Sequence, residues 1–407
     1  MRLSQLFPAA GLLAATASAA PTAPDGPLSL PENFNAATAS LGDFAKHAFD
    51  TAKSNIPFSG SCTPDKLVVR KEWGDMSAED RISYTNAVQC LQSKPARTPS
   101  ELAPGAKSHF DDWIVAHINQ TFFVHYTATF LSWHRWYIWE YEQALRNECG
   151  YTGYQPYWDW TKTAETGLET SPIFDGSATS LGGNGEHEPE TGDVVISVGD
   201  NPVYLAPGTG GGCVKSGPFS NYTVNLGPLS LSLLNGSSIG SSLTPTKGDD
   251  YLWNPRCLKR DLSDSVNKRH ANLTGVLNVL RKPQNVYDFQ MTLQAYPGSG
   301  EIGVHGGGHY SIGGDPGRDF FVSPGDPAFY LHHGMVDRTW WMWQMQNPAE
   351  RTKGSKALMG TGTFLNDPPS ANVTYEDEMN LGFVTDKTIK VKDVMSTTGG
   401  PFCYVYA

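Results

Sequence analysis

The sequence predicts a mainly α-helical globular protein. Of its 407 residues, 39% are hydrophobic and 17% are charged, a balance typical of chains that fold around a core. Two segments, residues 130–142 and 327–346, show the patterning expected of long, partly buried helices. We therefore expect one large domain that is built mostly of helices.

The first half of the chain carries several helix signals. Residues 21–60 are rich in Ala, Pro and Ser and read as a loosely packed N-terminal arm with a short helix over Leu41–Ala52. Ser77 followed by Asp80 can cap the start of a helix, and Ser100 can open another. Residues 61–407 then form the single main domain.

The second half changes character twice. Residues 166–256 contain Gly clusters and many Ser and Asn, so we expect a long irregular insertion with at most short strands. Helical patterning returns over residues 261–280 and 327–346. Residues 385–394 and 402–406 read as strands.

The N-terminus has the layout of a secretory signal peptide. Arg2 precedes an apolar run from Leu6 to Ala15, and the small residues up to Ala19 suit cleavage, so we assign residues 1–20 to this peptide. The run is too short to cross a bilayer, for which roughly 20 apolar residues are needed. We expect a secreted, extracellular protein without a membrane span.

Six scattered cysteines agree with an oxidising compartment. They permit fifteen pairings into three disulfides, and proximity in the chain favours one of them. The favoured pairs are Cys90 with Cys149, Cys213 with Cys257, and Cys62 with Cys403.

The net charge indicates the kind of partner, and five sequons indicate possible glycosylation. A net charge of -11 disfavours nucleic acid and anionic membranes as partners, because both call for a basic surface. We therefore expect a small-molecule substrate. The sequons lie at Asn119, Asn221, Asn235, Asn272 and Asn372.

Seven of the eleven histidines fall in two groups that border the Trp-rich segments. No Asp or Glu lies within either group's spacing, from His117 to His134 or from His305 to His309, so each group offers neutral imidazole rather than hard oxygen ligands. This favours copper, zinc, iron or nickel. The groups are His117, His125 and His134, and His305, His309, His332 and His333.

Spacing and ligand type narrow the choice of metal. His305 and His309 lie one helical turn apart, although the three glycines between them each cost roughly 1 kcal/mol of helix stability relative to Ala and so suggest that space is needed there. Two facing sites of three imidazoles, each with an open position, suit a small ligand such as dioxygen. Copper fits better than zinc, which has no redox chemistry.

Several motifs together make the chain resemble the type 3 copper family of tyrosinases, catechol oxidases and haemocyanins. The resemblance spans roughly residues 62–407. His117 and His125 are eight residues apart, as in the short secreted fungal tyrosinase-like catechol oxidases. The motifs are Phe130–Arg135, Pro156–Trp160, Ser323–His333, Asp337–Arg338 and Arg70–Trp73.

The resemblance implies a four-helix bundle core that holds two copper ions. Two residues are candidates for the first ligand. His109 lies sixteen residues before His125, which is closer to the longer spacing between the first two ligands in many tyrosinases, but the spacing of the short fungal group favours His117. Of the adjacent pair, His333 matches the ligand and His332 a supporting residue. The implied ligands are His117, His125 and His134 for the first copper, and His305, His309 and His333 for the second. We expect the remaining histidines, His47, His187 and His270, to lie on the surface.

Four further residues match positions near the reaction in this family. Glu301 matches a carboxylate that holds a water and helps to deprotonate a phenol, although an exposed loop carboxylate is a nearly equal alternative. Gly306 stands where good monophenol hydroxylases tend to carry Asn. Phe320 matches a residue that gates the second copper, and Phe329 one that stacks on a ligand imidazole.

Other matched residues imply support for the site. Asp159 and Asp337 are expected to orient imidazoles, or alternatively to pair with a nearby Arg. Arg70 is expected to contact the C-terminal Tyr404-Val405-Tyr406 and so tie both ends of the domain together. We expect no C-terminal shielding domain.

The resemblance implies an oxidase that converts o-diphenols to o-quinones with dioxygen reduced to water. A tyrosinase with monophenol hydroxylation and an o-aminophenol oxidase are alternatives within the family. A haemocyanin-like oxygen carrier and a dizinc hydrolase are alternatives of other classes. Because imidazole binds metal only when it is unprotonated, we also expect activity to fall in acid.

Overall fold

Helices dominate the computed structural model, which describes residues 34–56, 61–189, 192–196, 201–232, 238–239 and 250–407. The proposed signal peptide and Asn235 lie outside these residues. The α-helices are α1 (Leu41–Ser54), α2 (Ala78–Ser93), α3 (His109–Val124), α4 (Phe130–Cys149), α5 (Trp160–Thr166), α6 (Asp264–His270), α7 (Leu273–Arg281), α8 (Val286–Gln294), α9 (Gly303–Ile312), α10 (Ala328–Met345) and α11 (Pro348–Thr352). The mainly α class is thereby confirmed.

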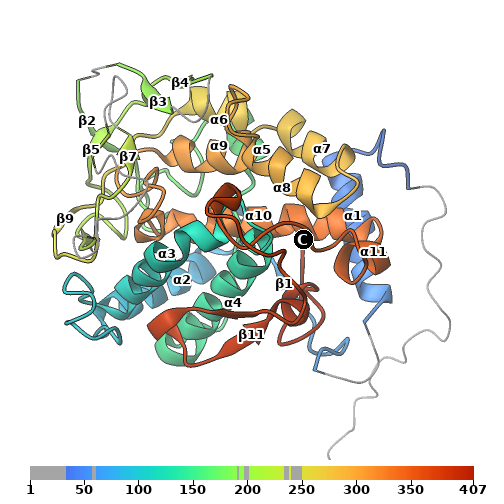
Figure 1. Cartoon of the computed structure of the whole chain (residues 1–407). Helices are drawn as coiled ribbons and strands as arrows, with labels where there is room; N and C mark the ends of the chain where they lie inside the picture. Colours follow the sequence, from blue (N-terminus) through green and yellow to red (C-terminus); the bar gives the residue numbers. More distant parts are fainter. Residues whose placement is uncertain (1–33, 57–60, 190–191, 197–200, 233–237, 240–249) are drawn as a thin grey trace, which may run out of the picture.

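The core is built around α10, which packs against α4, α9 and α1 (Figure 1). All 18 residues of α10 are buried, as expected of a helix that is covered on every side. The neighbouring α4 buries most of its length and ends at Gly150, which adopts the left-handed conformation that a residue with a Cβ disfavours. With α3 packed on α4, the helices α3, α4, α9 and α10 form the central bundle.

Cap residues decide where the first helices begin. Ser77 accepts a hydrogen bond from the Asp80 backbone and opens α2, as predicted. The prediction of a helix opened by Ser100 is wrong. Ser108 instead forms a capping box with Asp111 and opens α3, because these two side chains satisfy the free amide groups of the first turn.

The N-terminal arm is packed rather than loose. Its helix α1 begins at the predicted residue and runs two residues longer than expected. Phe44 and Ala48 are fully buried in the main core, where α1 lies against α10. The prediction of a loosely packed arm is therefore wrong for residues 34–56.

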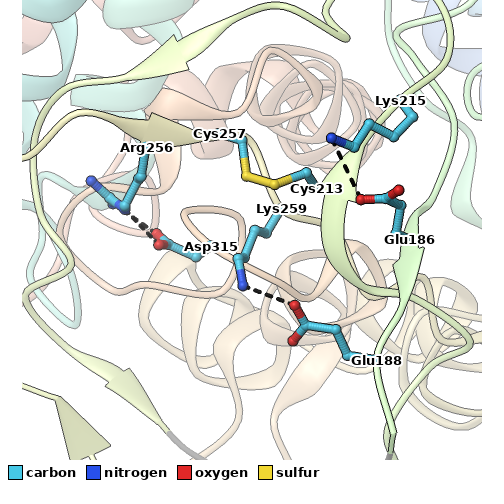
Figure 2. Close-up of a disulfide and its surroundings, with 8 residues drawn as sticks. All are labelled: Glu186, Glu188, Cys213, Lys215, Arg256, Cys257, Lys259 and Asp315. Atoms are coloured by element: carbon cyan, nitrogen blue, oxygen red, sulfur yellow. Dashed lines mark hydrogen bonds and ion pairs between the residues drawn. A yellow bond between two sulfur atoms is a disulfide. The ribbon is translucent and has the colours of Figure 1, made fainter.

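The described part of residues 166–256 forms the expected irregular insertion with strands of two to four residues. One disulfide joins Cys213 in β5 to Cys257 in β9 and is surrounded by ion pairs, among them Arg256 with Asp315 (Figure 2). The strands are β2 (Gly185–His187), β3 (Val194–Ile196), β4 (Val203–Leu205), β5 (Gly211–Val214), β6 (Thr223–Val224), β7 (Leu231–Ser232), β8 (Ser238–Ile239) and β9 (Arg256–Cys257).

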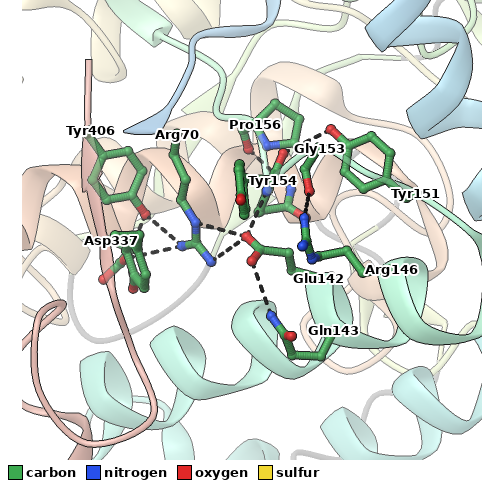
Figure 3. Close-up of polar contacts among 12 residues, drawn as sticks. Arg70, Glu142, Gln143, Arg146, Tyr151, Gly153, Tyr154, Pro156, Asp337 and Tyr406 are labelled. Carbon is green, nitrogen blue, oxygen red and sulfur yellow. Dashed lines mark hydrogen bonds and ion pairs between the residues drawn. The ribbon is translucent and has the colours of Figure 1, made fainter. Parts of the chain in front are cut away.

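The two ends of the domain are joined in one small parallel sheet. Strand β1 (Val68–Arg70) pairs with β12 (Tyr404–Tyr406), and a disulfide joins Cys62 to Cys403 beside them. The Arg70 guanidinium lies 3.7 Å from the centre of the Tyr404 ring and donates to the Tyr406 hydroxyl at 3.1 Å (Figure 3). The predicted tie between Arg70 and the C-terminal motif is confirmed, as are all three predicted disulfides.

Two other expectations need adjustment. The helical segment 261–280 is divided into α6 and α7, and α8 was not predicted. Within residues 385–394 only β11 (Thr388–Lys390) is a strand, paired with β10 (Glu378–Asn380), and a 3₁₀ turn follows it. Among the described residues, none of the helices has both the length and the apolar content that crossing a membrane requires.

Candidate metal centre

The first histidine group lies between α3 and α4. His117 projects from α3, His125 is the residue that ends this helix, and His134 projects from the first turns of α4. All three are buried, and one ring nitrogen from each lies within 4.8 Å of the others. Residues that are 17 positions apart or fewer thus converge because the chain reverses direction between the two helices.

Backbone carbonyl groups fix the orientation of these three rings. The Nδ1 atoms of His117, His125 and His134 lie 2.7–2.9 Å from the carbonyl oxygens of Phe321, Thr121 and Phe130. Because a carbonyl can only accept, each Nδ1 must carry the proton, which leaves the Nε2 lone pair free. The Nε2 atoms of His117 and His134 are buried without a hydrogen-bond partner. Such orphaned lone pairs fit a metal ion.

The second group lies between α9 and α10. His305 and His309 lie on one face of α9, and His332 and His333 lie on α10, with ligand atoms within 4.8 Å of one another. His309 donates from Nδ1 to the Gly317 carbonyl at 3.2 Å. The Nε2 atoms of His305 and His332 and both ring nitrogens of His333 are buried without partners. The unpartnered ring nitrogens of the second group therefore also fit a metal ion.

The glycines between His305 and His309 create the space that the sequence suggested. A Cβ at Gly308 would overlap the ring of His332, and a Cβ at Gly307 would lie 2.9 Å from the Ala271 backbone nitrogen. At Gly306 the nearest atom would be Ile302 Cβ at 3.0 Å, one turn earlier in the same helix. Gly307 and Gly308 are therefore required for packing, whereas at Gly306 the Ile302 side chain would have to shift slightly.

The two groups face each other across the bundle. The rings of His134 and His333 stack with 4.5 Å between centroids and 13° between planes, and those of His125 and His305 lie 6.2 Å apart. Phe130 packs between the groups, with its ring 5.0 Å from both His134 and His305. Two metal ions held by these groups would be neighbours.

Burial keeps the imidazoles neutral. It lowers the pKa of all seven histidines, and neighbouring imidazoles, which repel a second positive charge, lower several of them further. The pKa falls to about 3 for His125 and about 4 for His309. Neutral imidazole is the form that binds a metal.

Both predicted aromatic residues contact imidazoles of the two histidine groups. Phe329 is buried and lies against His333, with 4.1 Å between ring centroids. Phe320 is half-buried, and its ring lies 4.8 Å from His125 in the first group. The family match had implied that Phe320 gates the second copper, whereas its imidazole contact here is with the first group.

Two acidic residues do not orient imidazoles. Asp337 is buried and accepts hydrogen bonds from Arg135 at 2.5 Å, Tyr404 at 2.7 Å and Tyr406 at 2.5 Å. Asp159 caps the start of α5 by accepting from the Thr161 backbone and hydroxyl. The alternative of pairing with a nearby Arg is the correct one for Asp337, whereas Asp159 caps a helix.

Glu301 lies on the surface just before α9. Its side chain is 59% exposed and pairs with His270 Nδ1 at 3.0 Å and with Arg269 at 3.9 Å. His270 itself is buried, so the prediction that it lies on the surface is wrong. The predicted role of Glu301 as a base stays a prediction.

The other histidines lie apart from the two groups. His109 donates from Nδ1 to Asp112 at 2.7 Å inside α3 and is not a member of the first group, which supports the choice of His117. His187 is exposed, as predicted. His47 is half-buried and stacks on Phe34 at 3.9 Å.

The sequons differ in their surroundings. Asn119, Asn221 and Asn372 are exposed. Asn272 is half-buried and caps α7, and its Nδ2 donates to the Lys268 and Arg269 carbonyl oxygens at 2.7 and 3.1 Å. Both amide hydrogens are therefore in use in the folded chain.

Sequence reasoning missed the groups that hold the imidazoles. The carbonyl groups of Thr121 and Phe130 lie four residues before His125 and His134, a spacing that helix geometry could have suggested. The carbonyl groups of Gly317 and Phe321 gave no such signal, because any residue type supplies one. The contact of Trp160 with His332 also went unpredicted.

Comparisons with known proteins agree with this geometry. A model of the common central domain of tyrosinase matches residues 107–346. Tyrosinase P of Aspergillus terreus is 40% identical over 345 residues, covering 84% of this chain and 92% of that protein. N-acetyl-6-hydroxytryptophan oxidase of Emericella nidulans is 39% identical over 356 residues, covering 85% and 93%.

A solved structure is similar over nearly the whole chain. A mutant polyphenol oxidase from Thermothelomyces thermophila superimposes with a TM-score of 0.81 and 44% identity, covering 90% of this chain and 97% of that one. The chain belongs to the tyrosinase family of type 3 copper oxidoreductases. Its two histidine groups are suited to a dicopper centre.

Proposed function

We propose that this chain is a polyphenol oxidase that oxidises o-diphenols to o-quinones. Two diphenol molecules each give up two electrons and two protons, and one dioxygen takes up all four of each to become two water molecules. The observation that carries this proposal is the convergence of buried ring nitrogens, without partners, in two facing groups. A pair of redox-active ions fits these nitrogens and the family.

The proposed ligands are six of the seven histidines in the two groups. Bound copper would supply the electron transfer between diphenol and dioxygen. The chain contributes carbonyl groups that fix the imidazole tautomers and aromatic rings, among them Phe329, that hold the imidazoles in place. The ligands are His117, His125 and His134 for one copper, and His305, His309 and His333 for the other.

The half-buried Phe320 and the partly exposed Gly306 are the residues that we assign to the substrate pocket. Phe320 lies over His125 and offers an aromatic edge to a flat phenol. Gly306 leaves the turn between His305 and His309 without a polar side chain. By the family pattern, a site without an amide at this position favours diphenols over monophenols.

Copper analysis followed by parallel rate measurements tests the proposal. The purified protein should contain two copper ions per chain and oxidise catechol faster than a matching monophenol or an o-aminophenol. Reversible dioxygen binding without catechol turnover would identify an oxygen carrier instead. Bound zinc with no copper would point to a hydrolase.

We also propose that the protein is secreted and glycosylated. The support comes from the signal-like N-terminal sequence and from three disulfides, which form in oxidising compartments. The exposed sequons at Asn119, Asn221 and Asn372 are the proposed sites. Mass spectrometry of the secreted protein, before and after removal of N-glycans, would identify the modified residues.

A further inference from the structure

Four histidines of the second group lie close enough together to compete for one metal ion. One ring nitrogen from each of His305, His309, His332 and His333 lies within 4.8 Å of the others. Distance alone therefore does not select three ligands from the four. A chemical difference between the adjacent His332 and His333 has to make the choice.

The difference lies in the partner of His332. Trp160 lies at the start of α5, and its indole Nε1 is 3.1 Å from His332 Nδ1. An indole N–H can only donate, so Nδ1 of His332 must accept and cannot carry a proton. A neutral His332 then carries its proton on Nε2, a buried atom that has no hydrogen-bond partner of its own, and has no lone pair left for a metal. His333 has no partner at either ring nitrogen, so it has no such restriction.

Gly308 makes this arrangement sterically feasible. A side chain at this position would overlap the His332 ring at Nδ1 and Cε1, the two atoms beside the Trp160 contact. The ring therefore sits in a slot formed by a glycine of α9, with the indole of Trp160 5.2 Å away between ring centroids. Gly308 and the Trp160 indole therefore both lie against the Nδ1 edge of the His332 ring.

We propose that Trp160 is a positioning residue that selects His333 over His332 as the third ligand of the second copper by holding His332 in its Nε2-protonated tautomer. The inference rests on the proposed copper ligands. If His332 changed tautomer, two N–H groups would face each other in a buried site. The change would lose the hydrogen bond from the Trp160 N–H and leave that buried donor unsatisfied, a penalty that corresponds to roughly a ten- to hundredfold loss of metal affinity.

The tautomer can be read in the metal-free protein. Nitrogen-15 NMR of histidine-labelled protein should show His332 with an unprotonated Nδ1 and a protonated Nε2. Trp160→Phe, which keeps the aromatic ring and removes the N–H, should turn this signal into a mixture of both tautomers. A wild-type signal with protonated Nδ1 would overturn the proposal whether or not any variant folds.

The matched control is Trp158→Phe. Trp158 is also buried, and its Nε1 donates to Thr163 Oγ1 at 2.9 Å rather than to a histidine. Its ring lies 6.3 Å from that of His332. This variant should leave the His332 tautomer unchanged. An equal change in both variants would show that general loosening, and not the indole N–H, is responsible.

Copper stoichiometry gives a second test: whether a second substitution restores the copper that a ligand substitution removes. His333→Ala should bind one copper per chain, because His332 is blocked as a replacement. The double variant Trp160→Phe with His333→Ala should regain part of the second copper, since His332 can then present a lone pair. The double variant with Trp158→Phe should not. Two coppers in the single His333→Ala variant, or no recovery in the folded Trp160 double variant, would overturn the proposal.

The same experiment separates this inference from the proposed function. Wild-type protein that binds fewer than two coppers would contradict the dicopper site itself. Wild-type protein with two coppers, combined with an unexpected tautomer of His332, would contradict only the role of Trp160.

Discussion

The imidazole rings of His134 and His333 stack face to face with 4.5 Å between their centroids. His134 lies on α4 and His333 on α10, so this contact is where the two histidine groups meet. Both rings have a buried Nε2 without a partner. The packing of α4 on α10 therefore sets the separation of the two proposed metal ions.

Removal of one ligand should empty one site. His134→Ala is expected to lower copper from two ions to one per chain and to reduce catechol oxidation by at least about a hundredfold, because loss of even an outer partner of a ligand costs roughly ten- to a hundredfold. Metal analysis and rate assays would measure both effects. His187→Ala, at an exposed histidine, is the control and should keep two coppers.

Copper should stay bound well below the ordinary histidine pKa. Burial lowers the pKa of the proposed ligands, to about 4 for His309 and about 3 for His125, so protons compete for them only at lower pH. Because bound copper also competes with protons, copper content measured after dialysis at decreasing pH should persist through pH 6.5 and decline only at or below about pH 4. A loss centred close to pH 6.5 would contradict this prediction.

The metal-free protein should lose stability in acid. These histidines bind fewer protons when folded than when unfolded, since their folded pKa lies below the unfolded value of roughly 6.5. The free energy of unfolding should therefore decrease as the pH falls from about 6.5 toward the folded pKa values. Denaturant titrations of metal-free protein at several pH values would measure this slope.

Asp337 should matter for folding more than for chemistry. Asp337→Asn removes the charge that faces buried Arg135 and Arg70, and breaking a buried ion pair costs roughly 3–5 kcal/mol. We expect a clear fall in the denaturation midpoint, with copper stoichiometry retained in the folded protein. Asp75→Asn, at a carboxylate that is 66% exposed, should change stability by less than about 0.5 kcal/mol.

A side chain should be tolerated at Gly306 but not at Gly307 or Gly308. Gly306→Asn meets only Ile302 of its own helix, so folding stability should change by less than about 1 kcal/mol. Gly307→Asn would push against the Ala271 backbone and should destabilise the protein. Thermal unfolding would compare the two. If the family pattern holds, Gly306→Asn should also raise the monophenol rate relative to the diphenol rate.

Local rules in the sequence predicted much of the frame. The cap formed by Ser77 and Asp80, the aromatic segment that became α4, and the segment that became α10 are recognisable because capping and helical periodicity involve residues only a few positions apart. The same rules failed at Ser100, where no partner completes a capping box, and at Ser108, whose box with Asp111 was overlooked.

The sequence by itself determined the ligand chemistry: two groups of neutral imidazoles, the one-turn spacing of His305 and His309, and six cysteines whose favoured pairing the structure confirmed. Only the tertiary structure decided which backbone carbonyl holds each ring, that Asp337 serves the termini, and that Trp160 contacts His332. Ligand type is a property of a side chain, whereas orientation and protonation depend on neighbours that folding brings from distant parts of the chain.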